Sequence, residues 1–224
     1  MALADQWSMR DGKVRPSPVA EPRPGRLTLH LLREQARSCT ACDLYKRGTQ
    51  TVFGEGKPSA RIVLVGEQPG NEEDLSGRPF VRPAGRLLDE AMAKADMDRR
   101  EVYITNIVKH FKWKGEEGGK RRIHERPRQD EVEACRPWFD KELWIVKPEV
   151  LVCLGVTAAN AVMGRAITIR SVRGRALVSS YGLPTFVTVH PSAILRMPDR
   201  TVRQAEMRRF VADLRRARRA LPER

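Results

Sequence analysis

The chain has 224 residues, which is enough to bury one sizeable core with few appendages. Its 42 lysines and arginines outnumber 28 aspartates and glutamates, so the formal net charge is +14 at pH 7. This charge favours a nucleic-acid partner over an acidic small molecule. The longest apolar runs, such as residues 150–154, are far too short to cross a bilayer, and the N-terminal residues do not read as a secretory leader. We therefore expect a cytoplasmic monomer in a reducing compartment, with no membrane partner.

The first 26 residues differ in composition from the rest of the chain. They carry prolines at 16, 18, 22 and 24 among scattered charges, with few apolar residues that could pack. This composition predicts a disordered leader over residues 1–26, followed by a single domain over residues 27–224.

From residue 61 onward, short apolar runs rich in β-branched residues alternate with stretches of helical periodicity, and one further helical stretch precedes them. The predicted strands are residues 61–66, 102–106, 150–154 and 184–190, with a possible edge strand at 177–179. The predicted helices are residues 27–37, 84–95, 129–146 (with a kink or break at Pro137), 157–163 and 201–220. This alternation predicts a three-layer α/β/α fold around a central, mostly parallel sheet of four strands.

Polar side chains follow the carboxyl ends of three of these strands. Glu67 and Gln68 come after the first strand, Asn106 ends the second, and His190 follows the fourth. Ligands of open α/β sheets bind at this edge, where the connecting loops converge. Because no glycine-rich phosphate-binding fingerprint is present, a dinucleotide or ATP is disfavoured. The sequence therefore predicts a polar site at one edge of the sheet.

A basic segment at residues 118–127 reads GGKRRIHERP. Its glycines and its proline favour an exposed loop over the interior of a helix or strand. The cations at 120, 121 and 122 should favour the neutral, nucleophilic form of His124 and attract a polyanion. The alternative is a solvated basic surface on which the histidine is incidental. Residues 111–114 (FKWK) likewise suit stacking on single-stranded nucleic acid or, alternatively, a half-buried strand end.

Four cysteines occur, at positions 39, 42, 135 and 153. A reducing compartment argues against two disulfides, so shared ligation of zinc or an iron–sulfur cluster is favoured, and ligand count alone does not separate the two. Alternatively, Cys135 and Cys153 are small buried hydrophobic residues.

Together these motifs resemble the uracil-DNA glycosylase superfamily, specifically its iron–sulfur branch. The resemblance rests on GEQPG at residues 66–70, GRPFV at 77–81, Thr105 with Asn106, HPS at 190–192, and the four cysteines. The segment KRRIH at 120–124 further resembles the UdgX subgroup, whose members become covalently fixed to uracil-containing DNA. Arg82 is a departure, because glycine is usual there.

The resemblance implies a role for each candidate side chain. Phe80 would stack on the uracil ring, and Asn106 would accept from N3–H and donate to O4, with Gly66 and Ser192 also at the base. His190 would lie near uracil O2, Glu67 would stabilise the sugar cation, and Gln68 would organise the motif. His124 would attack C1′ of the sugar. Lys120, Arg122 and Arg196 would hold phosphates or the loop itself.

The resemblance also implies a structural [4Fe–4S] cluster held by Cys39, Cys42, Cys135 and Cys153, with zinc as the less favoured alternative, and a preference for single-stranded DNA. Three hypotheses follow from the sequence. The protein is a glycosylase that traps itself on uracil-containing DNA, a conventional glycosylase with multiple turnovers, or a non-catalytic nucleic-acid-binding protein.

Overall fold

A computed structural model describes residues 7–10, 13–16, 27–81, 83–115 and 122–223. Its central sheet has six strands in the order β3-β5-β4-β8-β10-β9. The four inner strands are β5 (Val102–Asn106), β4 (Ile62–Gly66), β8 (Val150–Leu154) and β10 (Pro184–Thr188), and they are parallel. Two short strands, β3 (Glu55–Gly56) and β9 (Leu177–Val178), add to the edges in antiparallel fashion. The prediction of four parallel strands was therefore right for the centre of the sheet and wrong for the total number of strands.

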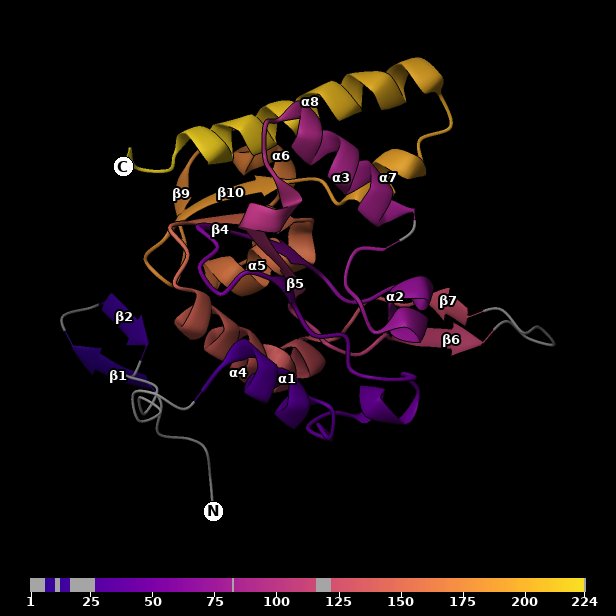
Figure 1. Cartoon of the computed structure of the whole chain (residues 1–224), viewed down its shortest axis with the longest axis vertical. Coiled ribbons are helices and arrows are strands. Elements are labelled where there is room, and N and C mark those ends of the chain that lie inside the picture. The colour runs from indigo at the N-terminus through magenta and orange to yellow at the C-terminus, as the bar shows by residue number, and fades with distance from the viewer. Residues whose placement is uncertain (1–6, 11–12, 17–26, 82, 116–121, 224) are drawn as a thin grey trace.

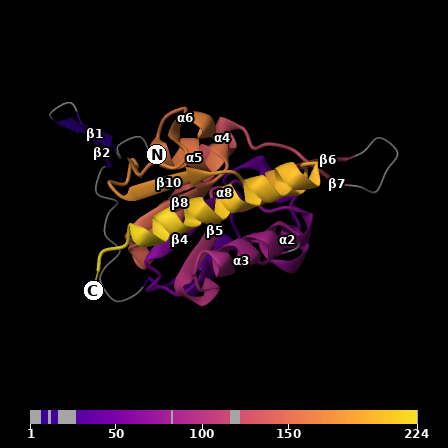
Figure 2. The same ribbon diagram turned by 90° about the horizontal axis from the view of Figure 1, so that it is seen from above.

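Helices cover both faces of the sheet, as the three-layer prediction requires (Figures 1 and 2). One face carries α1 (Leu29–Ala36), α4 (Gln129–Val146), α5 (Val156–Met163) and α6 (Ile169–Val172). The other carries α3 (Ala84–Lys94), α7 (Pro191–Leu195) and α8 (Arg200–Arg219). The inner strands β4, β5 and β8 are buried along their whole length because helices pack on both sides.

Proline does not break the longest helix on the first face. Pro137 lies inside α4 and is exposed, and the helix continues to Val146 as one element. The predicted break is therefore absent. Lys147 caps the C-terminal end of α4 in the left-handed conformation, with φ 51°.

Several short elements had no sequence prediction. Helix α2 (Asn71–Ser76) follows β4. The 3-10 helix η1 (Asp43–Lys46) follows α1, and the 3-10 helix η2 (Arg99–Glu101) directly precedes β5. Strands β1 (Trp7–Arg10) and β2 (Lys13–Pro16) form an antiparallel pair within the predicted leader, most of which lies outside the described residues. None of the helices in the described part of the chain is long and apolar enough to cross a membrane.

The basic segment differs most from its prediction. Residues Arg122–His124 form a strand, β7, which pairs with β6 (Trp113–Gly115) in a two-stranded antiparallel sheet. The prediction of a loop throughout residues 118–127 was therefore wrong for these three residues. His124 lies opposite Trp113 in this pairing, so a strand fixes its backbone.

Candidate active site

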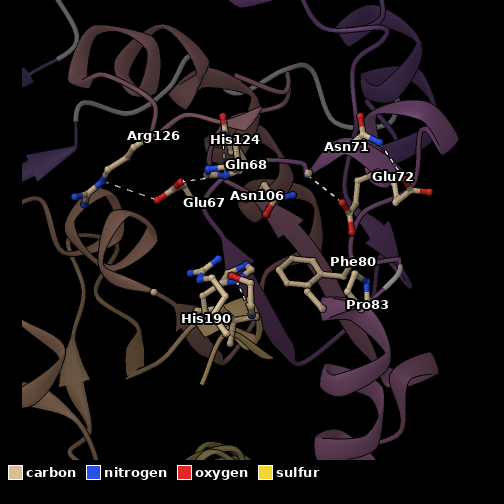
Figure 3. Close-up of a pocket in the computed structure, with 17 residues that line it drawn as sticks. Glu67, Gln68, Asn71, Glu72, Phe80, Pro83, Asn106, His124, Arg126 and His190 are labelled. Atoms are coloured by element: carbon tan, nitrogen blue, oxygen red, sulfur yellow. Dashed lines mark hydrogen bonds and ion pairs between the residues drawn. The ribbon is translucent and has the colours of Figure 1, made fainter. Parts of the chain in front are cut away.

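A cavity of about 680 Å³ opens at the carboxyl ends of the inner strands (Figure 3). Its volume lies within the range usual for small-molecule sites. The structure brings nearly all the predicted residues together there, since the lining includes Glu67, Gln68, Phe80, Asn106, His124, His190, Ser192 and Arg196. The site predicted at this edge of the sheet is thus present as a cavity.

Gly66, the last residue of β4, makes room for two of these side chains. A Cβ atom at Gly66 would lie 2.2 Å from Oδ1 of Asn106 and 2.6 Å from Cζ of Phe80. Asn106 is only 2% exposed, and its Oδ1 atom is buried without a hydrogen-bond partner. Buried acceptors in folded proteins are almost always paired. An unpaired acceptor at a cavity wall therefore indicates a place for a ligand that donates a hydrogen bond.

Phe80 forms another wall of the cavity and is held in an uncommon backbone conformation. Its φ is 51°, which side-chain-bearing residues rarely adopt, and its ring is nearly buried. Gly85 allows this conformation, because a Cβ there would lie 1.8 Å from the carbonyl oxygen of Phe80. The ring centroids of Phe80 and His190 are 5.6 Å apart. Strain of this kind is concentrated at functional sites.

His190 caps helix α7 and is held in one tautomer by that role. The backbone N–H of Ser192 donates to its Nδ1 atom over 3.2 Å, and the Ser192 hydroxyl lies 2.8 Å from the same atom. Burial, followed by the charges of His124 and Arg196, lowers the pKa of His190 to about 4. The ring is therefore neutral at pH 7. Because Nδ1 accepts, the proton sits on Nε2 and can be donated to a ligand.

Gln68 holds His124 and makes three contacts with the backbone beside the β6–β7 hairpin, one of them from its Nε2 to the carbonyl of Lys112 over 3.3 Å. Its Oε1 accepts from the N–H of Lys112 over 3.0 Å, and its Nε2 donates to the carbonyl of Glu125 over 2.8 Å. These partners determine which way the amide faces. Its Nε2 then lies 2.9 Å from Nε2 of His124 as a donor, so the histidine nitrogen must accept. The geometry thus gives a neutral His124 whose lone pair is on Nε2.

Among the described residues, the cation that acts on His124 is not one that the sequence suggested. Burial is the largest cause of its lowered pKa; Glu67 acts in the opposite direction, and Arg196 lowers the pKa further. Lys120, a predicted contributor, lies outside the described residues. The predicted neutral state thus agrees with the direction of the pKa shift. Arg196 is the described cation that contributes to it, and Arg121, like Lys120, lies outside the described residues.

Glu67 lies beside His124 and is held from its other side. Its Oε1 is 3.6 Å from Nε2 of His124, whereas its Oε2 accepts from the hydroxyl of Thr157 and lies 3.9 Å from Nε of Arg126. Arg126 also donates to Thr157 over 2.9 Å. Thr157 and Arg126 were not identified from the sequence. No short motif marks them, because they are distant in the chain from Glu67.

Arg122 points into the protein and not toward the cavity. Its guanidinium forms a 2.6 Å ion pair with the fully buried Asp74 and donates to Asn71 over 2.7 Å. It also lies 5.4 Å from the ring of Phe111 and 5.5 Å from that of Trp113. Arg122 was predicted to hold either phosphates or the loop itself, and these contacts fit the second role. Phe111 is buried as well, so the half-buried strand end describes residues 111–114 better than a free stacking surface.

The cysteines meet the metal prediction only in part. Among the described residues, no group of three or more cysteine, histidine, aspartate or glutamate side chains is placed to hold a metal ion. Burial raises the pKa of Cys135 to about 12, and Cys42 and Cys39 are among its electrostatic neighbours. Cys39 accepts from the indole N–H of Trp138 over 3.1 Å, and Cys135 from the N–H of Lys109 over 3.2 Å. N–H contacts of this kind stabilise thiolates, and here they reach two of the four sulfurs, those of Cys39 and Cys135.

Cys153 differs from the other three. It lies within β8 between Val65 and Val187 of the neighbouring strands and is fully buried. Burial alone raises the pKa of its thiol, and the other three cysteines make no contribution. The structure therefore does not bring Cys153 to the other three, and the alternative interpretation as a core residue describes its position better.

Comparison with known families agrees with this geometry. The model of the uracil DNA glycosylase superfamily matches residues 53–215, which is most of the chain. This chain belongs to the uracil-DNA glycosylase superfamily. The match includes every inner strand of the sheet, and with it the residues that line the cavity.

Curated relatives in this superfamily are similar over nearly their full length. A type-4 uracil-DNA glycosylase of Thermotoga maritima is 37% identical over 186 residues, which cover 83% of this chain and 90% of the relative. The type-4 enzyme of Pyrobaculum aerophilum is 35% identical, covering 77% of this chain and 87% of the relative. That of Archaeoglobus fulgidus is 38% identical, with 72% and 80% covered. The resemblance found in the sequence motifs is thus confirmed at the level of the superfamily.

Proposed function

We propose that the protein excises uracil from DNA and becomes covalently linked to the resulting sugar through His124. The observation that carries this proposal is the arrangement of Nε2 of His124, which accepts from Gln68 over 2.9 Å and lies 3.6 Å from a carboxylate oxygen of Glu67. An unprotonated ring nitrogen at the cavity wall is a nucleophile. The similarity to type-4 uracil-DNA glycosylases supports uracil as the substrate base.

Recognition of the base follows from the walls of the cavity. Oδ1 of Asn106 lacks a partner and would accept from N3–H of uracil, while the amide nitrogen would donate to O4. Cytosine has no proton on N3 and presents a donor where uracil presents O4, so it fits this amide poorly. The ring of Phe80 would stack on the extruded base. Single-stranded DNA would be preferred because an unpaired base costs less to extrude.

In the cleavage step, the bond between C1′ and N1 breaks and its electron pair leaves with the uracil. His190, neutral with its proton on Nε2, donates a hydrogen bond to O2 as negative charge develops there. The sugar acquires oxocarbenium character. The carboxylate of Glu67, which also lines the cavity, would stabilise this positive charge. Both groups are partly shielded from solvent, which strengthens these interactions.

In the capture step, the lone pair on Nε2 of His124 forms a bond to C1′. The ring becomes a cation that carries its proton on Nδ1; this proton is lost to solvent, and the departing uracil anion takes up one proton. Atoms and charge therefore balance without a further reactant. Gln68 must release Nε2 as the new bond forms, and its remaining backbone contacts would keep the hairpin in place.

A denaturing gel tests the proposal and separates the three hypotheses. After incubation with a uracil-containing oligonucleotide, a heat- and detergent-resistant band that requires uracil is expected. Free abasic DNA without that band would indicate a conventional glycosylase, and neither product would indicate a non-catalytic binding protein. His124→Ala should abolish the band, and His30→Ala, a change on the exposed side of α1, should retain it. Persistence of the band in the first variant rejects His124 as the linkage.

We also propose that the protein holds an iron–sulfur cluster through Cys39, Cys42 and Cys135, with a structural role. The fourth ligand we propose is His110, with Cys153 as the alternative. His110 is buried, follows the residue whose N–H binds Cys135, and packs against Gly48 just after the cysteine pair. Measuring iron and absorbance near 400 nm in His110→Ala and Cys153→Ala decides between them, since only loss of a ligand should lower both. Bound zinc in their place would reject the cluster.

Cluster thiols survive best in a reducing compartment, which supports the cytoplasmic location expected from the sequence. The monomeric state likewise stays a prediction, and light scattering of the free protein would test it.

A further inference from the structure

A network of buried charges lies directly beneath the base-recognising residue. The ammonium of Lys109 forms a 2.6 Å ion pair with Glu142 of α4, and their side chains are 0% and 1% exposed. The same ammonium donates to the carbonyl oxygen of Asn106 over 2.7 Å and to the hydroxyl of Thr105 over 2.7 Å. All three donors of the lysine are thus used, and one of them ends on the residue that faces the cavity.

The carboxylate of Glu142 ties this lysine to the strand that carries Asn106. It accepts from the hydroxyl of Tyr103 over 2.8 Å, from that of Thr105 over 3.0 Å and from the N–H of Gly54 over 3.0 Å. Tyr103 and Thr105 alternate with Asn106 along β5, so their side chains point away from the cavity while that of Asn106 points toward it. The network therefore holds the end of β5 from the side opposite the substrate.

Stability alone does not account for such a pair. Removing two charges from water costs several kcal/mol per ion, and a buried ion pair can often be replaced by apolar residues without loss of stability. What an apolar pair could not do is donate a hydrogen bond to the Asn106 carbonyl. Fixing that carbonyl fixes the peptide plane and the direction of the side chain, because the backbone beyond it is held as well: the N–H of Ile107 donates to Gly66 over 3.0 Å.

We propose that Lys109 and Glu142 are positioning residues that set base selectivity by aiming the Asn106 amide into the cavity. This role rests on the proposed function, in which Asn106 reads uracil. Neither residue touches the base, since both are fully buried. Their effect passes through the backbone of Asn106, which makes a specific prediction about how mutations combine.

The test compares single-turnover excision of uracil by the wild type and by three variants. Lys109→Met should slow excision by about 10- to 100-fold, the loss expected when a recognising group shifts by about 1 Å. Asn106→Ala should be slower still. In the double variant, Lys109→Met should add nothing to Asn106→Ala, because the lysine acts through the amide that has been removed. Multiplied losses would overturn the proposal, as would an unchanged rate in Lys109→Met.

Two controls separate positioning from general stability. Lys109→Met combined with Glu142→Leu replaces the pair by apolar residues and should recover most of the wild-type melting temperature while excision stays slow; recovery of the rate would overturn the proposal. Leu143→Ala changes the next residue of α4 and should lower stability through a cavity while the ratio of uracil to cytosine excision is kept. If Leu143→Ala lost as much selectivity as Lys109→Met, the effect of the lysine would be explained by stability alone.

Iron content and absorbance near 400 nm are measured in every variant, because the N–H of Lys109 also binds Cys135. The wild-type rate is the reference for all of them. No uracil release by the wild type would overturn the proposed function and this role with it, whereas release that the variants leave intact would overturn this role alone.

Discussion

Substituting alanine for Gly66 should disable base recognition while leaving the fold intact. The added Cβ would lie 2.2 Å from Oδ1 of Asn106, and an ordinary contact begins at 3.4 Å, so the amide must retreat by about 1.2 Å. The ring of Phe80, at 2.6 Å, must also move. Gly66 is not among the residues with positive φ, so alanine meets no backbone obstacle.

A displacement of about 1 Å at a reacting centre costs roughly 100-fold in rate, and overpacking costs about 1–3 kcal/mol of stability. We therefore expect Gly66→Ala to release uracil about 100-fold more slowly under single-turnover conditions and to melt a few degrees lower. Gly115→Ala is the matched control, because nothing lies within 4 Å of a Cβ at that position. If Gly66→Ala excised uracil at the wild-type rate, the packing of Asn106 and Phe80 over Gly66 would have no part in recognition.

Four further outcomes are expected. Asn106→Asp replaces the amide donor by an acceptor facing O4 and should reduce the preference for uracil over cytosine; unchanged discrimination in competition assays would contradict that role. Thr157→Val removes a donor to Glu67 and should slow excision by roughly 10-fold, measured by single-turnover kinetics. Adduct formation requires neutral His124, whose pKa is lowered below 6.5, so its rate should halve at a pH below 6.5; Arg196→Gln should move that pH upward, since a lowering charge is removed. Noncovalent DNA affinity should fall steeply with salt, and a flat response would argue against a phosphate-binding surface.

The layers and the cavity edge could be predicted from sequence because they depend on local patterns. Residues 102–106 and 150–154 are apolar, β-branched and bounded by turns, and both strands occur as predicted. Once parallel strands are assigned, their carboxyl ends share one edge, so Glu67, Asn106 and His190 must converge there. The helical periodicities of 84–95 and 201–220 were likewise sufficient, with bounds correct to one residue.

Elements that depend on partners distant in the chain could not be predicted. Strand β3 has two residues and exists because it pairs with β5. Strand β7 contains only Arg122, Ile123 and His124, and its pairing with β6 overrides the local loop preference of its glycine-rich and proline flanks. The bonds from Thr157 to Glu67 and from Lys109 to Glu142 join residues separated by 90 and 33 positions, and no spacing rule reaches that far.

In the described part of the basic segment, residues 122–127, the charge count overstates how much positive charge is offered to DNA. Arg122 is 16% exposed and is neutralised by Asp74, and Arg126 lies near Glu67. Charges paired in this way release few counterions when DNA binds, so they add little to the salt dependence. Arg196, which lines the cavity and forms no ion pair with the described residues, is a better candidate for a phosphate contact. Accordingly, Arg196→Gln should flatten the salt dependence more than Arg122→Gln, whose main effect should be to loosen the hairpin that carries His124.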